Sequence, residues 1–222
     1  MRIELATGTP AELALPSDDV TRGLVLLPDI MGLRPLFDDL CRRLAEEYGW
    51  AVCAPDPFPG RETLTLEERW EVMAALDDGR QLADLAAAAG VLEERTQTDR
   101  VAVLGFCMGG MYAFKAAGTG RYDRSVAFYG MIRPPEAWRG PGQGEPMDFL
   151  ARPEAGPVLA ILGGRDPYTP PEDIEALRAL GDRVTVVVYP EADHGFVHDP
   201  SRPTHRLDDA ADAWRRVAEF LA

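Results

Sequence analysis

The stretch Val101-Ala-Val-Leu-Gly-Phe-Cys107-Met-Gly-Gly110 decides the fold of this chain. The apolar residues Val101–Leu104 indicate a buried strand, which runs through a G-x-C-x-G sequence into an apolar helical pattern. This arrangement is typical of a nucleophile elbow, in which the central residue sits on a strained turn. The flanking glycines avoid collisions with the neighbouring strand and helix. The competing interpretation is a tight strand-to-helix turn around an inert, buried thiol.

On both sides of this stretch, strand-length apolar runs alternate with helical patterns. The expected strands are Arg2–Leu5, Glu12–Leu15, Gly23–Leu27, Trp50–Ala54, Val101–Leu104, Ser125–Tyr129, Val158–Leu162 and Val184–Tyr189. Helices are expected at about Leu36–Tyr48, in stretches within Leu66–Glu94, from the elbow to Gly118, at Pro171–Leu180 and at Leu207–Leu221. Apart from a short antiparallel pair at the N-terminus, this alternation predicts a mostly parallel sheet with helices on both faces. The fold class is therefore α/β, and 222 residues suit a single domain over positions 1–222.

Ligands bind at the carboxyl ends of the strands in such sheets, so residues that directly follow strands are candidates for chemistry. A cysteine nucleophile needs a base to take its proton and a third group to orient that base. Asp166 follows the strand Val158–Leu162, and His194 follows the last strand. The order nucleophile, acid, histidine is the one that accompanies such an elbow. We therefore expect a catalytic triad of Cys107, Asp166 and His194, which requires no metal or organic cofactor.

Each triad position also has an ordinary structural interpretation. An Asp before a Pro is commonly a turn or a helix cap, which applies to Asp166. Asp193 is an alternative acid, although neighbours in sequence point their side chains apart. His198 and His205 come later in the chain and are less well placed than His194. The coincidence of all three positions, rather than any single one, favours the triad.

The bulk composition excludes several classes of protein. Acidic side chains number 37 against 23 basic ones, a net charge of −14, which disfavours nucleic acid and anionic lipid as partners. No apolar run approaches the roughly 20 residues of a membrane-spanning helix, and the N-terminus lacks the apolar core of a secretory signal. The three cysteines lack CxxC spacing, and we see no metal-ligand pattern. We expect a cytoplasmic protein in a reducing compartment, a monomer or small homo-oligomer that acts on a small molecule.

With these residues in place, the chain resembles the dienelactone hydrolase family (carboxymethylenebutenolidases) of α/β-hydrolases, from about Leu24 to the C-terminal helix. The resemblance rests on the segments Leu27–Gly32, Ala54–Phe58, Gly105–Gly110, Leu162–Pro167 and Ala192–Phe196. It implies a single-domain α/β-hydrolase fold and hydrolysis of small esters or lactones through Cys107, His194 and Asp166. It further implies an oxyanion hole formed by the backbone N–H groups of Ile30 and Met108, which agrees with the general rule for this fold.

Two positions depart from the family pattern. Members typically carry a Glu that contacts the resting thiol, and here that position is Asp29, which either modulates the thiol or shapes the loop. Members that act on dienelactone use an Arg four residues after the catalytic histidine, and here that residue is His198. Arg61 and Arg69 are nearby cations without a firm match. The resemblance therefore leaves the substrate open.

Tyr129 at a strand end, Phe196 and His198 are the candidate substrate-binding residues. The long Pro- and Gly-rich segment 133–157, which contains Trp138, is either a lid or wall of the site or a plain surface excursion.

Two other functions compete with the ester or lactone hydrolase. One is a thioesterase or acyl hydrolase that uses the same triad. The other is a non-catalytic redox-sensing or ligand-binding protein, in which a reactive Cys107 would be oxidised to sulfenic acid. A sensor, however, would not need Asp166 and His194 in register.

Overall fold

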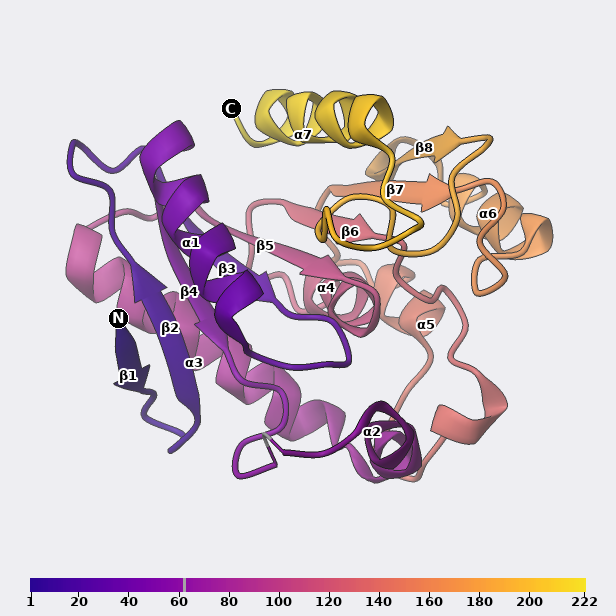
Figure 1. The fold of residues 1–222 in the computed structure, drawn as a ribbon, viewed down its shortest axis with the longest axis horizontal. Helices are drawn as coiled ribbons and strands as arrows, with labels where there is room; N and C mark the ends of the chain where they lie inside the picture. The colour runs from indigo at the N-terminus through magenta and orange to yellow at the C-terminus, as the bar shows by residue number, and fades with distance from the viewer. Residues whose placement is uncertain (62) are drawn as a thin grey trace.

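A single eight-stranded sheet forms the centre of the computed structural model, which describes residues 1–61 and 63–222 (Figure 1). Its strands are β1 (Arg2–Glu4), β2 (Pro10–Ala14), β3 (Arg22–Leu27), β4 (Trp50–Pro55), β5 (Val101–Phe106), β6 (Ser125–Phe128), β7 (Val158–Gly163) and β8 (Val184–Tyr189). They lie in the order β1-β2-β4-β3-β5-β6-β7-β8. The β1–β2 and β2–β4 pairs are antiparallel, and the other pairs are parallel.

The helices are α1 (Pro35–Tyr48), α2 (Leu66–Val72), α3 (Asp78–Thr96), α4 (Met108–Ala117), α5 (Pro146–Leu150), α6 (Pro171–Arg178) and α7 (Leu207–Leu221). Short 3₁₀ turns occupy Met73–Ala75 (η1), Glu136–Trp138 (η2) and Gly181–Arg183 (η3). In Figure 1, α1 crosses in front of β3 and β4 while α3 passes behind them, so both faces of the sheet are covered. This arrangement confirms the expected α/β fold.

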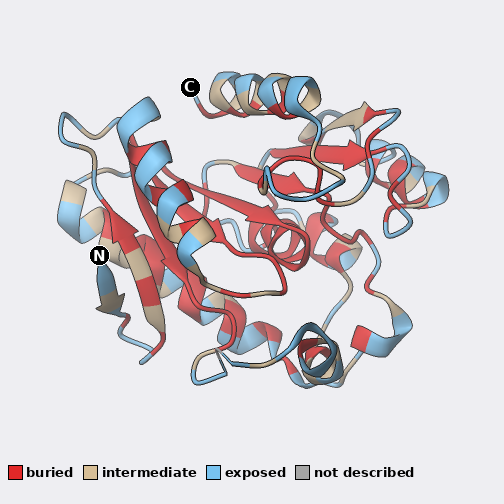
Figure 2. Cartoon of the chain, in the orientation of Figure 1, coloured by how far each residue is buried: buried red, intermediate tan, exposed pale blue. Residues whose placement is uncertain are grey.

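The central strands are buried along their whole length, as their continuous apolar sequences predict (Figure 2). Seven of the eight strands differ from their expected ranges by one or two residues at an end, and β8 matches its expected range. The antiparallel pairing of β1 with β2 is also as expected. The alternation of strand and helix therefore carries most of the information about the fold.

The segment 133–157 is folded onto the body of the molecule. It contains η2 and α5, which its Pro- and Gly-rich sequence did not predict. The carbonyl of Gly142 accepts a hydrogen bond from the N–H of Asp78 (2.9 Å), and the N–H of Gly144 donates to the Asp78 carboxylate (2.8 Å). The buried ammonium of Lys115 lies 2.7 Å from the same carboxylate. The contacts of Asp78 thus tie this segment to α3 and α4.

Among the helices of the described residues, none combines the length and the apolar character needed to cross a membrane.

Candidate active site

The elbow between β5 and α4 presents Cys107 at the carboxyl edge of the sheet. Cys107 has φ 57° and ψ −117°, a conformation that L-residues rarely adopt, and its N–H donates to the carbonyl of Phe128 (3.0 Å). A Cβ on Gly105 would lie 2.0 Å from the carbonyl oxygen of Gly109, and one on Gly109 would lie 2.4 Å from that of Leu27. Both glycines are therefore needed because backbone occupies the space of a side chain.

The loops after β7 and β8 bring Asp166 and His194 together. Nδ1 of His194 lies 2.8 Å from Oδ2 of Asp166, and the other oxygen of Asp166 accepts the N–H of Tyr168 (2.9 Å). Asp166 is 4 % exposed, so these bonds fix the carboxylate in a buried position. The carboxylate of Asp193, the alternative acid, instead accepts the backbone N–H of His194 (2.7 Å). The ring of His194 is thus oriented by Asp166.

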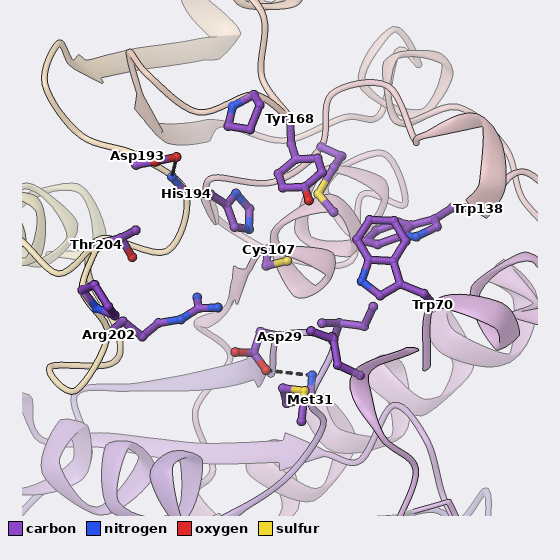
Figure 3. A pocket seen from close by; sticks show the side chains of 15 residues that line it. Asp29, Met31, Trp70, Cys107, Trp138, Tyr168, Asp193, His194, Arg202 and Thr204 are labelled. Atoms are coloured by element: carbon purple, nitrogen blue, oxygen red, sulfur yellow. Dashed lines mark hydrogen bonds between the residues drawn. The ribbon is translucent and has the colours of Figure 1, made fainter. Parts of the chain in front are cut away.

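Cys107 and His194 both line one cavity, and Figure 3 shows the sulfur and the imidazole facing the same space. Burial lowers the pKa of His194, but its hydrogen bond to Asp166 and the influence of Cys107 outweigh burial and raise the pKa to about 10. Nε2 of His194 is buried and has no hydrogen-bond partner among the described residues. This nitrogen is therefore available to exchange a proton with the thiol, a leaving group or water.

The two expected oxyanion donors flank the elbow. Met108 is the first residue of α4, a position whose N–H has no acceptor within the helix. Ile30 lies in the loop after β3 and lines the cavity, and its N–H has no acceptor in the described part of the chain. Both groups are thus free to donate to a developing oxyanion.

Asp29 belongs to a buried network beneath the cavity. Its carboxylate accepts the N–H of Met31 (2.9 Å), two bonds from the guanidinium of Arg34 (2.6 and 3.0 Å) and one from Nε2 of His198 (2.8 Å). Nδ1 of His198 in turn meets the hydroxyl of Tyr129 at 2.5 Å. The network joins the loop after β3, the end of β6 and the loop after β8.

The protonation states in this network follow from burial and partners. Burial would raise the pKa of Asp29, but His198 and Arg34 outweigh it and hold the pKa below its ordinary value. Burial lowers the pKa of His198 in spite of Asp29, and it raises the pKa of Tyr129. A neutral His198 then donates from Nε2 to the carboxylate and accepts the Tyr129 proton at Nδ1.

The cavity has a volume of about 460 Å³, within the range of small-molecule sites. Its lining is mainly apolar and aromatic and includes Leu66, Trp70, Met131, Trp138 and Tyr168. The residues that line it do not include Tyr129, Phe196 or His198, which are at most 5 % exposed. These three candidate substrate-binding residues pack beneath the cavity floor.

Arg202 is a cavity residue that the sequence analysis missed. Its guanidinium reaches toward the space above Cys107 from the side opposite Trp70 (Figure 3). Among the described residues no carboxylate pairs with it. Arg69, in contrast, donates to the carbonyls of Leu64 and Arg61 and does not line this cavity. No local pattern marks Arg202, because it lies in an irregular Pro-containing loop.

The sequence analysis also did not identify the three aromatic rings that line the cavity as site residues. Tyr168 had a usable signal, because it comes two residues after Asp166. Trp138 was noted only as a part of the segment 133–157, and Trp70 lies on the short helix α2, where no motif distinguishes it. Within residues 1–61 and 63–222, no cluster of three or more His, Cys, Asp or Glu side chains is arranged to hold a metal ion.

Comparison with known proteins connects this geometry to a family. The sequence profile described as "Dienelactone hydrolase family" matches residues 10–222. A protein of Methylorubrum extorquens, provisionally named carboxymethylenebutenolidase, is 33 % identical over 96 % of this chain and 76 % of its own length. A protein of Escherichia coli strain K12 with the same provisional name is 32 % identical over 96 % of this chain and 81 % of its own length.

Solved structures agree with this assignment of the fold. The crystal structure of a provisionally named dienelactone hydrolase from Klebsiella pneumoniae aligns with a TM-score of 0.88 and 26 % identity, over 100 % of this chain and 97 % of that one. A dienelactone hydrolase-like promiscuous phosphotriesterase from metagenomic libraries aligns with a TM-score of 0.78 and 22 % identity, over 100 % and 96 % of the two chains. At that identity the second likeness concerns the fold alone.

Proposed function

The chain belongs to the dienelactone hydrolase family and is a hydrolase of ester or lactone substrates, and from this premise we propose that it works through a covalent cysteine intermediate. Cys107 is the proposed nucleophile, His194 the general acid and base, and Asp166 the residue that orients His194. Ile30 and Met108 are the proposed oxyanion donors.

One observation carries this proposal. The 2.8 Å contact between Asp166 and His194 engages Nδ1, while Nε2 has no hydrogen-bond partner in the part of the chain that the structure describes. The imidazole of His194 also shares a cavity with the sulfur of Cys107. The proposed nucleophile follows β5, the orienting acid follows β7 and the base follows β8, so the three groups come from separate segments at the carboxyl ends of these strands. This is the arrangement that nucleophilic catalysis by a thiol requires.

The first half of the reaction forms an acyl-enzyme. The thiolate of Cys107 attacks the substrate carbonyl, and the oxygen takes up the electron pair as an oxyanion stabilised by the N–H groups of Ile30 and Met108. Each such donor is worth about 3 kcal/mol in comparable hydrolases. When the C–O bond breaks, protonated His194 gives its proton to the leaving alkoxide. The products of this half are the alcohol and a thioester on Cys107.

The second half releases the acid. Neutral His194 takes a proton from a water molecule, whose oxygen attacks the thioester carbonyl. The second tetrahedral intermediate collapses with expulsion of the Cys107 thiolate, so that the carboxylic acid leaves and His194 is again protonated. Asp166 stabilises the imidazolium at both stages.

Asp29 has a different proposed role from direct contact with the thiol. Its carboxylate oxygens are occupied by Met31, Arg34 and His198, so it holds the loop that carries Ile30. Tyr129 and His198 are proposed to support this loop from below, with Phe196 packed against the ring of Tyr129 (5.7 Å between ring centroids). We propose that the segment 133–157 serves as a fixed wall of the site through Trp138.

The test compares wild type with Cys107→Ala in the hydrolysis of p-nitrophenyl acetate. We expect the variant to lose roughly 10³-fold or more in kcat, as happens when a triad nucleophile is removed. Brief reaction should also leave one acetyl group on the wild-type peptide that contains Cys107. Cys53→Ala, which removes a thiol buried in β4, is the matched control and should retain activity. Equal rates of p-nitrophenyl acetate hydrolysis by wild type and Cys107→Ala would refute the proposal.

A further inference from the structure

A row of aromatic rings extends from the imidazole of His194 along one side of the cavity. The ring of Tyr168 meets that of His194 edge-on, with centroids 5.0 Å apart and planes at 73°. Trp70 follows at 6.2 Å from Tyr168, and Trp138 at 4.8 Å from Trp70. Figure 3 shows these three rings on the same side of Cys107. We name Tyr168, Trp70 and Trp138 the aromatic wall.

The aromatic wall comes from three separate parts of the chain. Tyr168 lies in the loop after β7, Trp70 on α2, and Trp138 in η2. At the mouth of the cavity the wall is open to solvent, because Tyr168 is 36 % exposed and neighbouring Leu66 is 43 % exposed. Trp138, in contrast, is fully buried and packs behind Trp70. A large aromatic side chain that lines a cavity and remains exposed, as Tyr168 does, indicates a binding surface more than a core.

The wall is held in place before any ligand arrives. The Thr65–Glu68 capping box fixes the start of α2, which carries Trp70. The backbone next to Trp138 is clamped against η1, since a Cβ on Gly140 would lie 1.8 Å from the carbonyl oxygen of Ala74. Gln143 also donates to the carbonyl of Met73. A preorganised wall loses little entropy when it binds a ligand.

The position of the wall identifies the part of the substrate that lies against it. His194 must deliver its proton to the leaving oxygen, so the alcohol portion of the ester lies beside the imidazole. Tyr168 packs on the edge of this same imidazole and continues into Trp70 and Trp138. An alcohol portion that continues from the imidazole along Tyr168 reaches Trp70, and the acyl portion then extends toward the opposite side, where Arg202 lines the cavity.

We propose that the part of the cavity along the aromatic wall is a subsite for aromatic leaving groups. The preferred substrates are then esters of phenolic or benzylic alcohols. A planar ring laid against Tyr168 and Trp70 gains stacked or edge-on contact beyond its simple apolar burial. The proposal rests on the hydrolytic role of Cys107 and His194, and it adds the class of the leaving group.

A matched pair of esters separates aromatic contact from leaving-group reactivity. Benzyl acetate and cyclohexylmethyl acetate release alcohols of similar acidity and size, and they differ in whether the ring is aromatic. The added contact predicts a wild-type preference for benzyl acetate in kcat/KM of about two- to tenfold. Trp70→Leu should reduce this preference to less than about twofold, and Trp70→Phe should retain most of it, since a phenyl ring preserves the aromatic face.

Two controls define the location of the effect. Tyr48→Leu removes an aromatic ring that stacks on Trp50 outside the cavity, and it should leave the benzyl preference unchanged. The pair methyl phenylacetate and methyl cyclohexylacetate places the ring on the acyl side, with a methylene that prevents conjugation to the carbonyl, and here we expect no comparable preference. Binding of both acetates to Cys107→Ala, followed by tryptophan fluorescence, reports the subsite without turnover and should show tighter binding of benzyl acetate.

The results distinguish this inference from the proposed mechanism. If Cys107→Ala binds the two acetates equally, or if the benzyl preference of the wild type persists in Trp70→Leu, the aromatic subsite is refuted while Cys107 can still be the nucleophile. A preference confined to the acyl-side pair also refutes it. Tighter benzyl binding without any turnover that depends on Cys107 would refute the mechanism and support the subsite.

Discussion

At the scale of single residues, Cys107 differs from the other two cysteines of the chain. Cys41 and Cys53 are buried in the core, and burial raises the pKa of each well above its ordinary value, to about 12 for Cys53. Cys107 instead stands at a helix N-terminus on a cavity that it shares with His194. Neither buried thiol lines that cavity, so a redox sensor would lack a resolving partner beside Cys107.

The raised pKa of His194 predicts how stability changes with pH. The folded protein holds the His194 proton up to about pH 10, whereas the unfolded chain releases it near 6.5. The stabilisation from this group is therefore complete below pH 6.5 and is lost as pH rises through 10. Over this interval the free energy of unfolding should fall more steeply for wild type than for His194→Gln. Urea unfolding at a series of pH values measures the difference, and parallel curves for the two proteins would contradict it.

At the scale of elements, the ion pair between Lys115 on α4 and Asp78 on α3 connects the segment 133–157 to the body of the fold. Asp78 uses one carboxylate oxygen for Lys115 and the other for the N–H of Gly144. The Lys115 ammonium also lies 4.8 Å from the ring centroid of Tyr112. Since this segment carries Trp138, the buried pair is positioned to keep one wall of the cavity in place.

Breaking this pair should cost stability. Lys115→Met leaves the Asp78 carboxylate buried without its cation, and we expect a loss of about 3–5 kcal/mol in the free energy of unfolding. Urea denaturation measures the loss, and limited proteolysis should show earlier cleavage within 133–157. Arg42→Met, which removes an exposed partner of Asp39, serves as the control and should leave the midpoint unchanged. A stability equal to that of wild type would show that Lys115 does not hold the segment.

At the scale of the whole molecule, the net charge of −14 contrasts with the guanidinium of Arg202 in the cavity, which has no carboxylate partner among the described residues. The surplus acidic side chains create a field that repels anions at long range, and salt screens this field beyond about 10 Å. The guanidinium of Arg202, in contrast, lines the cavity on the side of Cys107 opposite Trp70. We therefore expect any preference for negatively charged substrates to come from contact with Arg202 in the cavity and not from the overall charge of the protein.

A pair of acyl groups tests this expectation. The 4-nitrophenyl monoester of adipic acid carries a terminal carboxylate, and 4-nitrophenyl hexanoate has the same chain length without it. Arg202→Gln should lower kcat/KM for the anionic ester on the order of tenfold relative to the neutral one, consistent with loss of a charge-assisted hydrogen bond. Arg206→Gln removes an exposed cation that pairs with Asp209, and it should change neither rate. An equal effect of Arg202→Gln on both esters would exclude a charge-specific contact.

The sequence by itself determined the sheet, the helices outside the segment 133–157 and the order of the expected nucleophile, acid and base. These features follow from local signals, because the period of apolar residues decides strand or helix and the glycines of the elbow have no sterically acceptable substitute. The proximity of Asp166 and His194 could be predicted because each lies in the loop that follows a strand, and the carboxyl ends of parallel strands meet at one edge.

Only the tertiary structure decided how the cavity is walled and which groups Asp29 contacts. Asp29 and His198 are separated by 169 positions, and Trp70, Trp138 and Tyr168 belong to three loosely patterned segments. Contacts of this kind depend on the final path of the loops, and no local periodicity records that path. For the same reason the sequence does not distinguish Arg202 from a surface arginine, and only the structure shows that it points toward Cys107.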